Sequence, residues 1–186
     1  MRDDFAVFIL THGRAENVIT VKTLIKQGYT GRWYIVIDDE DEQEQQYRKI
    51  YGDKVLQFAK KDIAKEFDTM DTQKDRRTIV YARNACFELA KEVKARYFLE
   101  LDDDYTEFMY RYQSGNKLMH KDFKQLDDVF AAMIDFLIDT NADTVAFAQG
   151  GDFIGGLKSG TYQKKVLRKA MNTFFCDVEK PFKFIG

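Results

Sequence analysis

The sequence contains little proline and little cysteine, and each shortage excludes a class of protein. One proline in 186 residues argues against proline-rich linkers and disorder. The two cysteines, Cys86 and Cys176, form no CxxC pair and accompany no histidine cluster. A zinc site or a disulfide framework is therefore not indicated, and we expect two buried free thiols in a reducing cytoplasm.

Long apolar runs and an excess of one charge are also lacking. The most apolar helix-like stretch, 129–138, is interrupted by Asp135 and is too short to span a bilayer. The N-terminus, MRDDF, has no apolar signal core. We therefore expect a cytoplasmic protein without a membrane partner. The formal net charge of −2 excludes a generic polyanion binder, so contact with nucleic acid would require a local basic patch.

Several catalytic signatures are missing. The chain has neither GxGxxG nor GxxxxGK[ST], which argues against dinucleotide oxidoreductases and P-loop NTPases. It has no GxSxG, and its two histidines, His12 and His120, lie far apart in the sequence. A Ser/His triad or a metalloprotease site is therefore not expected.

What is present is an alternation of apolar runs and amphipathic segments. Hydrophobic residues make up 45% of the chain and aromatic residues 15%, enough for a core of large side chains. We predict strands at 5–10, 33–37, 55–58, 96–101 and 144–148, with a further strand at 105–112. We predict helices at 16–27, 40–51, 78–93 and 122–140. This order indicates an α/β protein with a mostly parallel central sheet and helices on both faces.

Polar clusters follow three of these strands. They are Thr11 to Arg14, Asp38 with Asp39, and Asp102 to Asp104. In parallel α/β sheets, ligands bind outside the carboxyl ends of the strands. The topology should therefore bring the three clusters to one rim.

The third cluster is the most informative. The run YFLELDDDY, residues 97–105, reads as a buried strand that ends in three carboxylates. Such groups repel one another unless a cation or water screens them, and oxygen ligands suit Mg²⁺ or Mn²⁺. The alternative is a solvated acidic turn. It stays open because the DxD spacing of Asp102 and Asp104 is a short pattern with many chance matches.

Other candidates are ambiguous alone. Asp38 or Asp39 can bind a nucleoside or simply end a strand, and Arg83 can bind phosphate oxygens or be an ordinary helix residue. His12 and Arg14 flank a glycine whose backbone N–H groups favour an anion. A basic segment follows the glycine-rich residues 149–160, and it either binds phosphates or is a solvated face. It contains Lys158, Lys164, Lys165, Arg168 and Lys169.

Taken together, THGR, IDDED and YARNACFELAKEVKARYFLELDDDY resemble the GT-A fold glycosyltransferases, over roughly residues 5–105. The finer resemblance, through THGR, RKAMNTFF and the Phe-Ile-Gly ending, is to the TET-associated glycosyltransferase group of phage and related genomes. The resemblance implies a GT-A-like, Rossmann-type three-layer sandwich that uses a nucleotide-sugar donor and Mn²⁺ or Mg²⁺. It implies transfer of a hexose or pentose to a hydroxyl, with hydroxymethylated pyrimidines in DNA as the candidate acceptor, inside a bacterial or phage-infected cell.

The resemblance also implies roles for individual residues. Asp104 should ligate the metal, and Asp102 should contact the metal or the ribose. Asp38 or Asp39 should hold the nucleoside, and Arg83 should lie near the base or the diphosphate. The remaining residues of the expected nucleotide pocket are Thr11, His12, Arg14 and Asp103.

One departure concerns the catalytic base. Relatives of this fold carry an acidic pair at a helix start beyond the glycine-rich loop, about where this sequence stops. We therefore expect one glycosyltransferase domain, 1–186, that ends before the acceptor side. Asp152 is the only nearby substitute for the base. Two alternatives stay open: a nucleotidyltransferase on a similar sheet, and a non-catalytic domain that binds a nucleotide or a partner protein.

Overall fold

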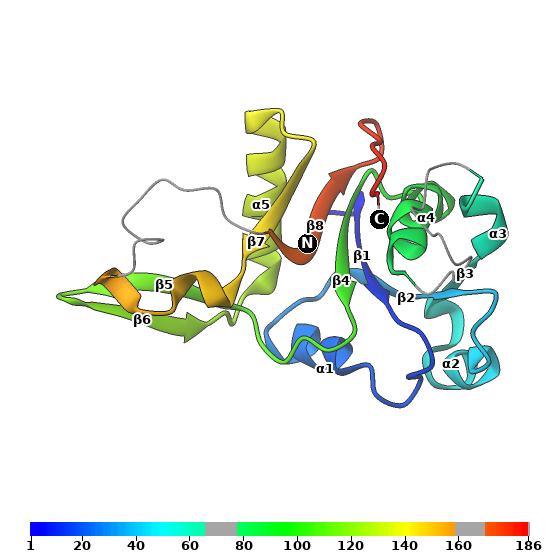
Figure 1. The fold of residues 1–186 in the computed structure, drawn as a ribbon, viewed down its shortest axis with the longest axis horizontal. Coiled ribbons are helices and arrows are strands. Elements are labelled where there is room, and N and C mark those ends of the chain that lie inside the picture. The colour runs from blue at the N-terminus through cyan, green and yellow to red at the C-terminus, as the bar shows by residue number, and fades with distance from the viewer. Residues whose placement is uncertain (66–77, 159–169, 186) are drawn as a thin grey trace.

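A six-stranded sheet with the order β3-β2-β1-β4-β8-β7 forms the centre of the molecule (Figure 1). The computed structural model describes residues 1–65, 78–158 and 170–185, apart from the side chain of Asp152. Its strands are β1 (Phe5–Leu10), β2 (Arg32–Asp38), β3 (Val55–Phe58), β4 (Tyr97–Asp102), β5 (Met109–Ser114), β6 (Lys117–Asp122), β7 (Thr144–Ala148) and β8 (Ala170–Asp177). Its α-helices are α1 (Ile19–Lys26), α2 (Glu44–Tyr51), α3 (Lys60–Ile63), α4 (Val80–Glu92) and α5 (Leu126–Thr140).

The sheet is mixed and mostly parallel. Strands β1 to β4 pair in parallel, whereas β8 is antiparallel to both of its neighbours, β4 and β7. The five strands predicted for this sheet are confirmed, with ends shifted by no more than a residue or so. The strand β8 was not predicted, because its sequence, AMNTFFCD, lacks the continuous apolar run that marks β1.

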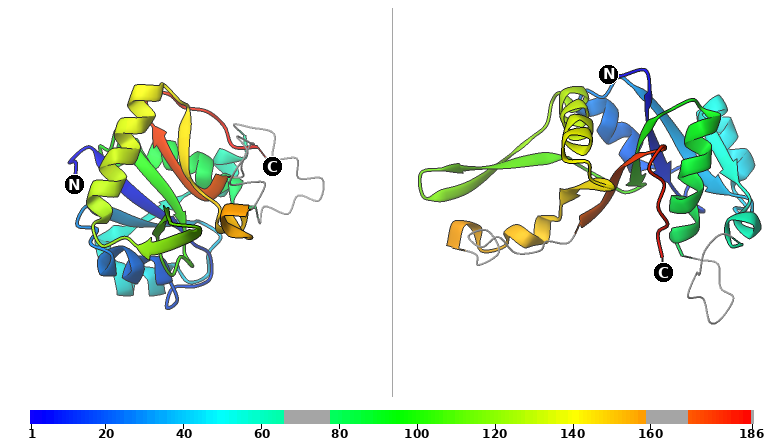
Figure 2. Two further views of the ribbon diagram at one scale, coloured as in Figure 1. Left: turned by 90° about the vertical axis from the view of Figure 1, so that its left-hand side faces the viewer. Right: turned by 90° about the horizontal axis from the view of Figure 1, so that it is seen from above.

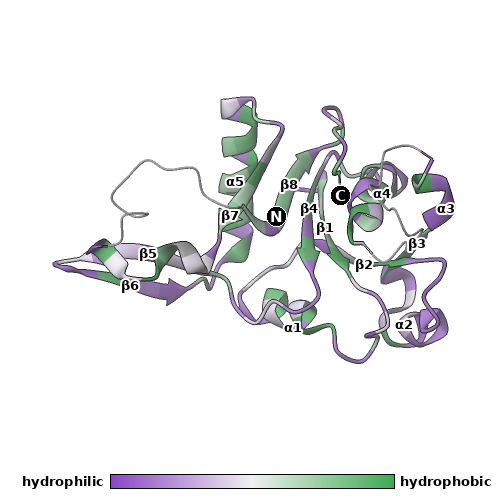
Figure 3. Cartoon of the chain, in the orientation of Figure 1, coloured by the Kyte–Doolittle hydropathy of each residue, from purple (hydrophilic) through white to green (hydrophobic). Residues whose placement is uncertain are grey.

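Helices cover both faces of the sheet, as the sequence predicted (Figure 2). Alternate residues of β1 point to opposite faces: Phe5, Val7 and Ile9 pack with α1 and α5, whereas Ala6, Phe8 and Leu10 pack with α4. All six are buried, which explains the unbroken apolar run of this strand. Figure 3 shows the central strands as largely hydrophobic.

All four predicted helices begin later than predicted, α4 by two residues and α1, α2 and α5 by three or four. The start of α5 is displaced because β6 extends to Asp122, and before α1 and α2 local hydrogen bonds hold the preceding residues in turns. A turn from Arg14 to Asn17 precedes α1. Before α2, the Asp38 carboxylate accepts the backbone N–H of Glu40, and the Asp41 carboxylate accepts that of Gln43. Aspartate side chains that bond two residues ahead favour turns over helix.

The single strand predicted at 105–112 is wrong in its bounds, since β5 begins at Met109 and pairs with β6 in an antiparallel hairpin. A two-residue loop, Gly115–Asn116, joins the strands, and Gly115 has a positive φ of 55°, which glycine adopts most readily. The hairpin extends away from the main sheet (Figure 1). Two short 3₁₀ turns, η2 (Gly150–Phe153) and η3 (Gly156–Lys158), follow β7 where the sequence predicted a flexible glycine loop.

In the described ranges, no helix combines the length and the apolar character that crossing a bilayer would require. Both cysteines are buried and free, as expected.

Candidate active site

One pocket, with a volume of about 540 Å³, lies where β1, β2 and β4 end. Because β2 and β4 flank β1 on opposite sides, this is the point at which the strand order reverses, the usual ligand position in an open α/β sheet. All three polar clusters contribute to the pocket, as the topology predicted. Its lining residues are Leu10, Thr11, His12, Arg14, Asp38, Phe58, Lys60, Thr78, Ile79, Tyr81, Ala82, Asp102, Asp103 and Asp104.

The middle aspartate, Asp103, ties the first cluster to the third. Its Oδ2 accepts a 2.6 Å hydrogen bond from the Thr11 hydroxyl, and its Oδ1 accepts a 3.0 Å bond from Nη1 of Arg14. The Asp103 side chain is almost fully buried. Both of its oxygens therefore bind protein groups, so the geometry indicates that Asp103 positions Thr11 and Arg14.

Helix α2 and the residues before it form hydrogen bonds to the loop after β1, residues 11–14. The Tyr47 hydroxyl accepts the backbone N–H of Arg14 at 2.8 Å and lies 3.1 Å from the Thr11 hydroxyl. Since Thr11 already donates to Asp103, Tyr47 donates to Thr11. The backbone N–H of Gly13 donates to the Asp41 carboxylate. These bonds hold the loop after β1 in one conformation at the pocket wall.

At the end of β2, Asp38 lines the pocket between His12 and Lys60. Its Oδ2 lies 2.9 Å from Nδ1 of His12, and its Oδ1 lies 3.1 Å from Nζ of Lys60. Lys60 is itself buried. Asp39, by contrast, is exposed, does not line the pocket, and accepts the backbone N–H of Lys60. Of the two predicted nucleoside ligands, the geometry therefore favours Asp38.

The environment of Asp38 lowers the pKa of its carboxyl group. Burial acts to raise that pKa, but hydrogen bonds from His12 and Lys60 favour the charged form and outweigh it. The unfolded chain consequently takes up the proton at a higher pH than the folded chain does. The contacts of Asp38 with His12 and Lys60 therefore stabilise the fold at pH values above the ordinary aspartate pKa. Their contribution is lost as the pH falls through and below that value.

We expect Asp38→Asn to lower the free energy of unfolding at pH 7 by about 3 kcal/mol, because it leaves buried Lys60 without its closest carboxylate. The difference from wild type should shrink as pH falls from 6 to 3. Urea unfolding at each pH measures both quantities. Asp39→Asn is the matched control, since that side chain is exposed. A difference that stays constant with pH would contradict this prediction.

At the end of β4, Asp102 has one satisfied and one unsatisfied oxygen. Its Oδ2 accepts a 2.9 Å hydrogen bond from Asn172 on β8. Its Oδ1 is buried and has no hydrogen-bond partner within the described chain, although Nη2 of Arg83 lies 4.0 Å away. Burial raises the pKa of Asp102, and the neighbouring Asp104 and Asp103 add to this effect against the opposing Asn172 and Arg83. Asp104 is exposed at the same rim.

This donor set fits a divalent cation. An unsatisfied buried carboxylate oxygen on Asp102 and a solvent-facing carboxylate on Asp104 are hard oxygen ligands of the kind that Mg²⁺ and Mn²⁺ prefer. Among the described residues, no group of three or more His, Cys, Asp or Glu side chains is arranged to hold a metal. The chain would therefore supply two carboxylates, and substrate oxygens and water would complete the coordination shell, as is usual for Mg²⁺.

Arg83 does not line the pocket, although the family resemblance implied a position near the base or the diphosphate. Its guanidinium lies 4.9 Å from the ring centroid of Phe174 and 5.7 Å from that of Phe184, stacked as cations often are on aromatic faces. Beneath it, Glu100 is fully buried, and burial raises its pKa well above the usual range. Arg83 therefore lies close to Asp102 without lining the pocket, and its charge favours the ionised form of Asp102.

Two predicted elements fall outside the described residues. The side chain of Asp152, the substitute for the catalytic base, is one of them. Four of the five basic residues after the glycine-rich stretch are the other, since 159–169 are not described. Lys158 is described and exposed.

Sequence reasoning missed several residues of the site. Lys60 belonged to a charged segment without periodicity, and Tyr47 and Asp41 lay in a helix predicted to be largely solvated. Asn172 lies on the unpredicted strand β8. One signal was available: Glu100 interrupts an otherwise apolar run, and a carboxylate in a buried strand marks a position with an unusual environment.

Comparison with solved structures supports the same architecture. The crystal structure of S. aureus TarS 1-349 matches with a TM-score of 0.50 and 14% sequence identity, over 94% of this chain and 47% of that one. The chain thus spans less than half the length of that structure, and the likeness concerns the fold. The GT-A-like α/β class expected from the sequence is confirmed.

The sequence places the chain within that class. The family model of the TET-associated glycosyltransferases matches residues 5–186, and the chain belongs to this family. Membership of this glycosyltransferase family sets the nucleotidyltransferase alternative aside. No curated protein matches the chain significantly.

Proposed function

We propose that this chain transfers a sugar from a nucleotide-sugar donor to a hydroxyl group, with a hydroxymethylated pyrimidine in DNA as the acceptor, and that Asp102 and Asp104 bind a divalent metal. The observation that carries the proposal is the convergence of the three strand ends on one pocket. One end of that pocket carries Asp102, which has one unsatisfied carboxylate oxygen, and another carries the Asp38–His12–Lys60 network.

The two ends of the pocket suit the two ends of a nucleotide sugar. At the first, a bound Mg²⁺ or Mn²⁺ would neutralise charge on the diphosphate as it leaves. At the second, the network of Asp38, His12 and Lys60 would orient the nucleoside. The rings of Phe58 and Tyr81 line the pocket and offer apolar contact to a base.

The reaction then follows from these positions. An oxygen of the acceptor hydroxyl attacks the anomeric carbon, the bond from that carbon to the diphosphate oxygen breaks, and the nucleoside diphosphate leaves with the electron pair. A carboxylate accepts the hydroxyl proton, and Asp152 is our candidate for it. Arg83 stabilises the charged form of Asp102 through the long ion pair behind it. A pyrimidine in duplex DNA must leave the base stack to reach the pocket.

A donor screen by thermal shift tests this proposal. We expect nucleotide sugars to raise the melting temperature of the wild type in the presence of Mn²⁺, and to do so less without it, because binding to the folded state stabilises it. Nucleoside triphosphates should have a smaller effect. Stabilisation by donor that is the same with Mn²⁺ and with a chelator would contradict the metal site but leave the donor site in place.

A further inference from the structure

We propose that the outer face of the β5–β6 hairpin binds the nucleic-acid strand that carries the acceptor. This inference rests on the proposed DNA acceptor and adds the surface that holds it. In an antiparallel pair, residues directly opposite each other share a face. Tyr110 pairs with Lys121, Tyr112 with Met119, and Ser114 with Lys117, so one face of the hairpin interleaves aromatic, apolar and cationic side chains.

The opposite face of the hairpin is partly covered by the two 3₁₀ turns. The guanidinium of Arg111 lies 4.8 Å from the ring centroid of Phe153 on η2, and Leu118 lies beside Gly156 on η3. The outer face has no such cover within the described chain: Tyr110 is 40% exposed, Tyr112 41% and Met119 40%. Large side chains this exposed on a projecting ribbon indicate a surface for a partner.

The aromatic rings on the outer face form a row. The ring centroids of Tyr112 and Tyr110 lie 5.7 Å apart, and those of Tyr110 and Phe123 lie 5.6 Å apart with an interplanar angle of 27°. Beyond the hairpin, Phe123 and Lys124 help to line a hollow of about 530 Å³ against α5. Rows of aromatic rings are platforms on which the bases of a nucleic-acid strand stack.

The charge on this face fits a polyanion. Lys117 and Lys121 lie on it and Lys124 lies at its inner end; all three are exposed, and none forms an ion pair with a described residue. On the outer face of the two strands no described residue is acidic, since Asp122 pairs with Met109 on the opposite face. Two acidic residues, Asp122 and Asp128, line the hollow at its inner end together with the basic Lys121 and Lys124. The chain as a whole is slightly acidic. The exposed lysines therefore form a local basic patch of the kind that binds a phosphate backbone.

The hairpin is anchored next to the candidate metal ligands. The buried side-chain amide of Gln27 accepts the backbone N–H of Phe108 at 2.7 Å and donates to the carbonyl oxygens of Phe108 and Phe123. The backbone N–H of Tyr105 donates to the Thr20 hydroxyl. The short segment 103–108 therefore connects the end of β4 to the hairpin through fixed contacts.

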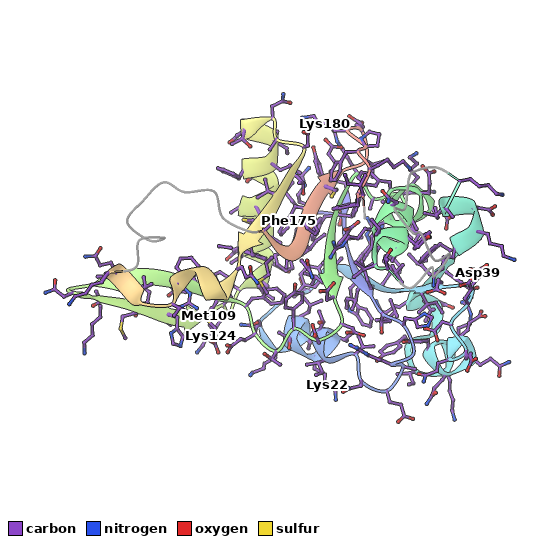
Figure 4. The ribbon with its side chains drawn as sticks, viewed as in Figure 1. Lys22, Asp39, Met109, Lys124, Phe175 and Lys180 are labelled. Carbon is purple, nitrogen blue, oxygen red and sulfur yellow. The ribbon has the colours of Figure 1, made fainter. Side chains whose placement is uncertain are left out.

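The test is DNA binding by the whole chain, measured by fluorescence anisotropy with hydroxymethylated single-stranded and duplex DNA over a range of salt concentrations. We expect Lys117→Gln/Lys121→Gln to weaken binding and to reduce the slope of log K against log salt by about 1.4 to 1.8, for two lost phosphate contacts. We expect Tyr112→Ala to weaken binding about five-fold or more, chiefly for single strands. Lys22→Gln/Lys49→Gln is the control, because it removes the same charge from exposed sites on α1 and α2. Figure 4 shows Lys22 away from the hairpin.

Donor stabilisation in the thermal-shift assay is measured for every variant and should stay at the wild-type level. Hairpin variants that bind DNA as the wild type does would overturn the inference and leave the proposed function standing. A wild type that binds donor but no DNA would overturn the inference together with the DNA acceptor. A dimer in solution that the hairpin variants dissociate would show that a second copy occupies the face, which also overturns the inference.

Discussion

Replacing Asp104 with asparagine should lower sugar transfer by about 100-fold or more. The substitution removes the charge of one of the two carboxylates proposed to hold the metal, and the loss of one such electrostatic contact to the leaving group has an effect on the order of 100- to 1000-fold. Asp104 is exposed, so the melting temperature without ligand should not change. The measurement is release of nucleoside diphosphate with hydroxymethylated DNA and Mn²⁺.

Glu107→Gln is the matched control for this prediction. Glu107 is an exposed carboxylate a few residues further along the chain, outside the pocket, and its neutralisation should leave transfer within about two-fold of the wild type. Equal losses in the two variants would indicate a general charge effect. An Asp104→Asn variant that keeps full Mn²⁺-dependent activity would rule out Asp104 as a ligand.

Replacing Phe130 with alanine should lower the free energy of unfolding by about 4 kcal/mol, the usual cost of removing a buried phenylalanine. Phe130 is fully buried on α5, and its ring packs against those of Phe5, Tyr29 and Phe175, with centroids 5.3 to 6.1 Å away. It therefore joins α5 to the central strands β1 and β8. The midpoint and slope of urea unfolding measure the loss.

Phe136→Ala provides the comparison on the same helix. Its side chain is 56% exposed, so the same chemical change should alter stability by only about 0.5 kcal/mol. Similar losses for the two variants would mean that α5 does not pack on the sheet as the structure shows. Both variants should retain the donor response, because neither residue contacts the pocket.

The sheet was largely predictable because its strands carry their own signals. The run Phe5–Leu10 is buried on both faces, and that environment selects an unbroken apolar sequence. The hairpin and β8 were harder to predict. Tyr110 and Tyr112 face outward on a projecting ribbon, and β8 pairs with β4 from far along the chain. Neither element leaves a regular hydrophobic period in the sequence.

The candidate site likewise contains some residues that the sequence predicted and others that it did not. Asp38, Asp102 and Asp104 follow directly on buried strands, so topology alone placed them at one rim. The partners that define their chemistry come from elsewhere: Lys60 from the residues after β3, Tyr47 from α2 and Asn172 from β8. A side chain that acts through a contact remote in sequence has no local pattern by which to be recognised.

The amino-acid sequence by itself determined that this chain forms a mostly parallel α/β sheet with acidic and polar groups at its carboxyl edge. Burial leaves a local pattern of apolar residues, and the alternation of strands and helices indicates parallel strands. Only the tertiary structure decided which groups each carboxylate contacts. It turned Asp103 inward onto Thr11 and Arg14, left one oxygen of Asp102 without a partner in the described chain, and set Arg83 behind the pocket rather than in it. Those assignments depend on distances between residues far apart in sequence, which folding alone establishes.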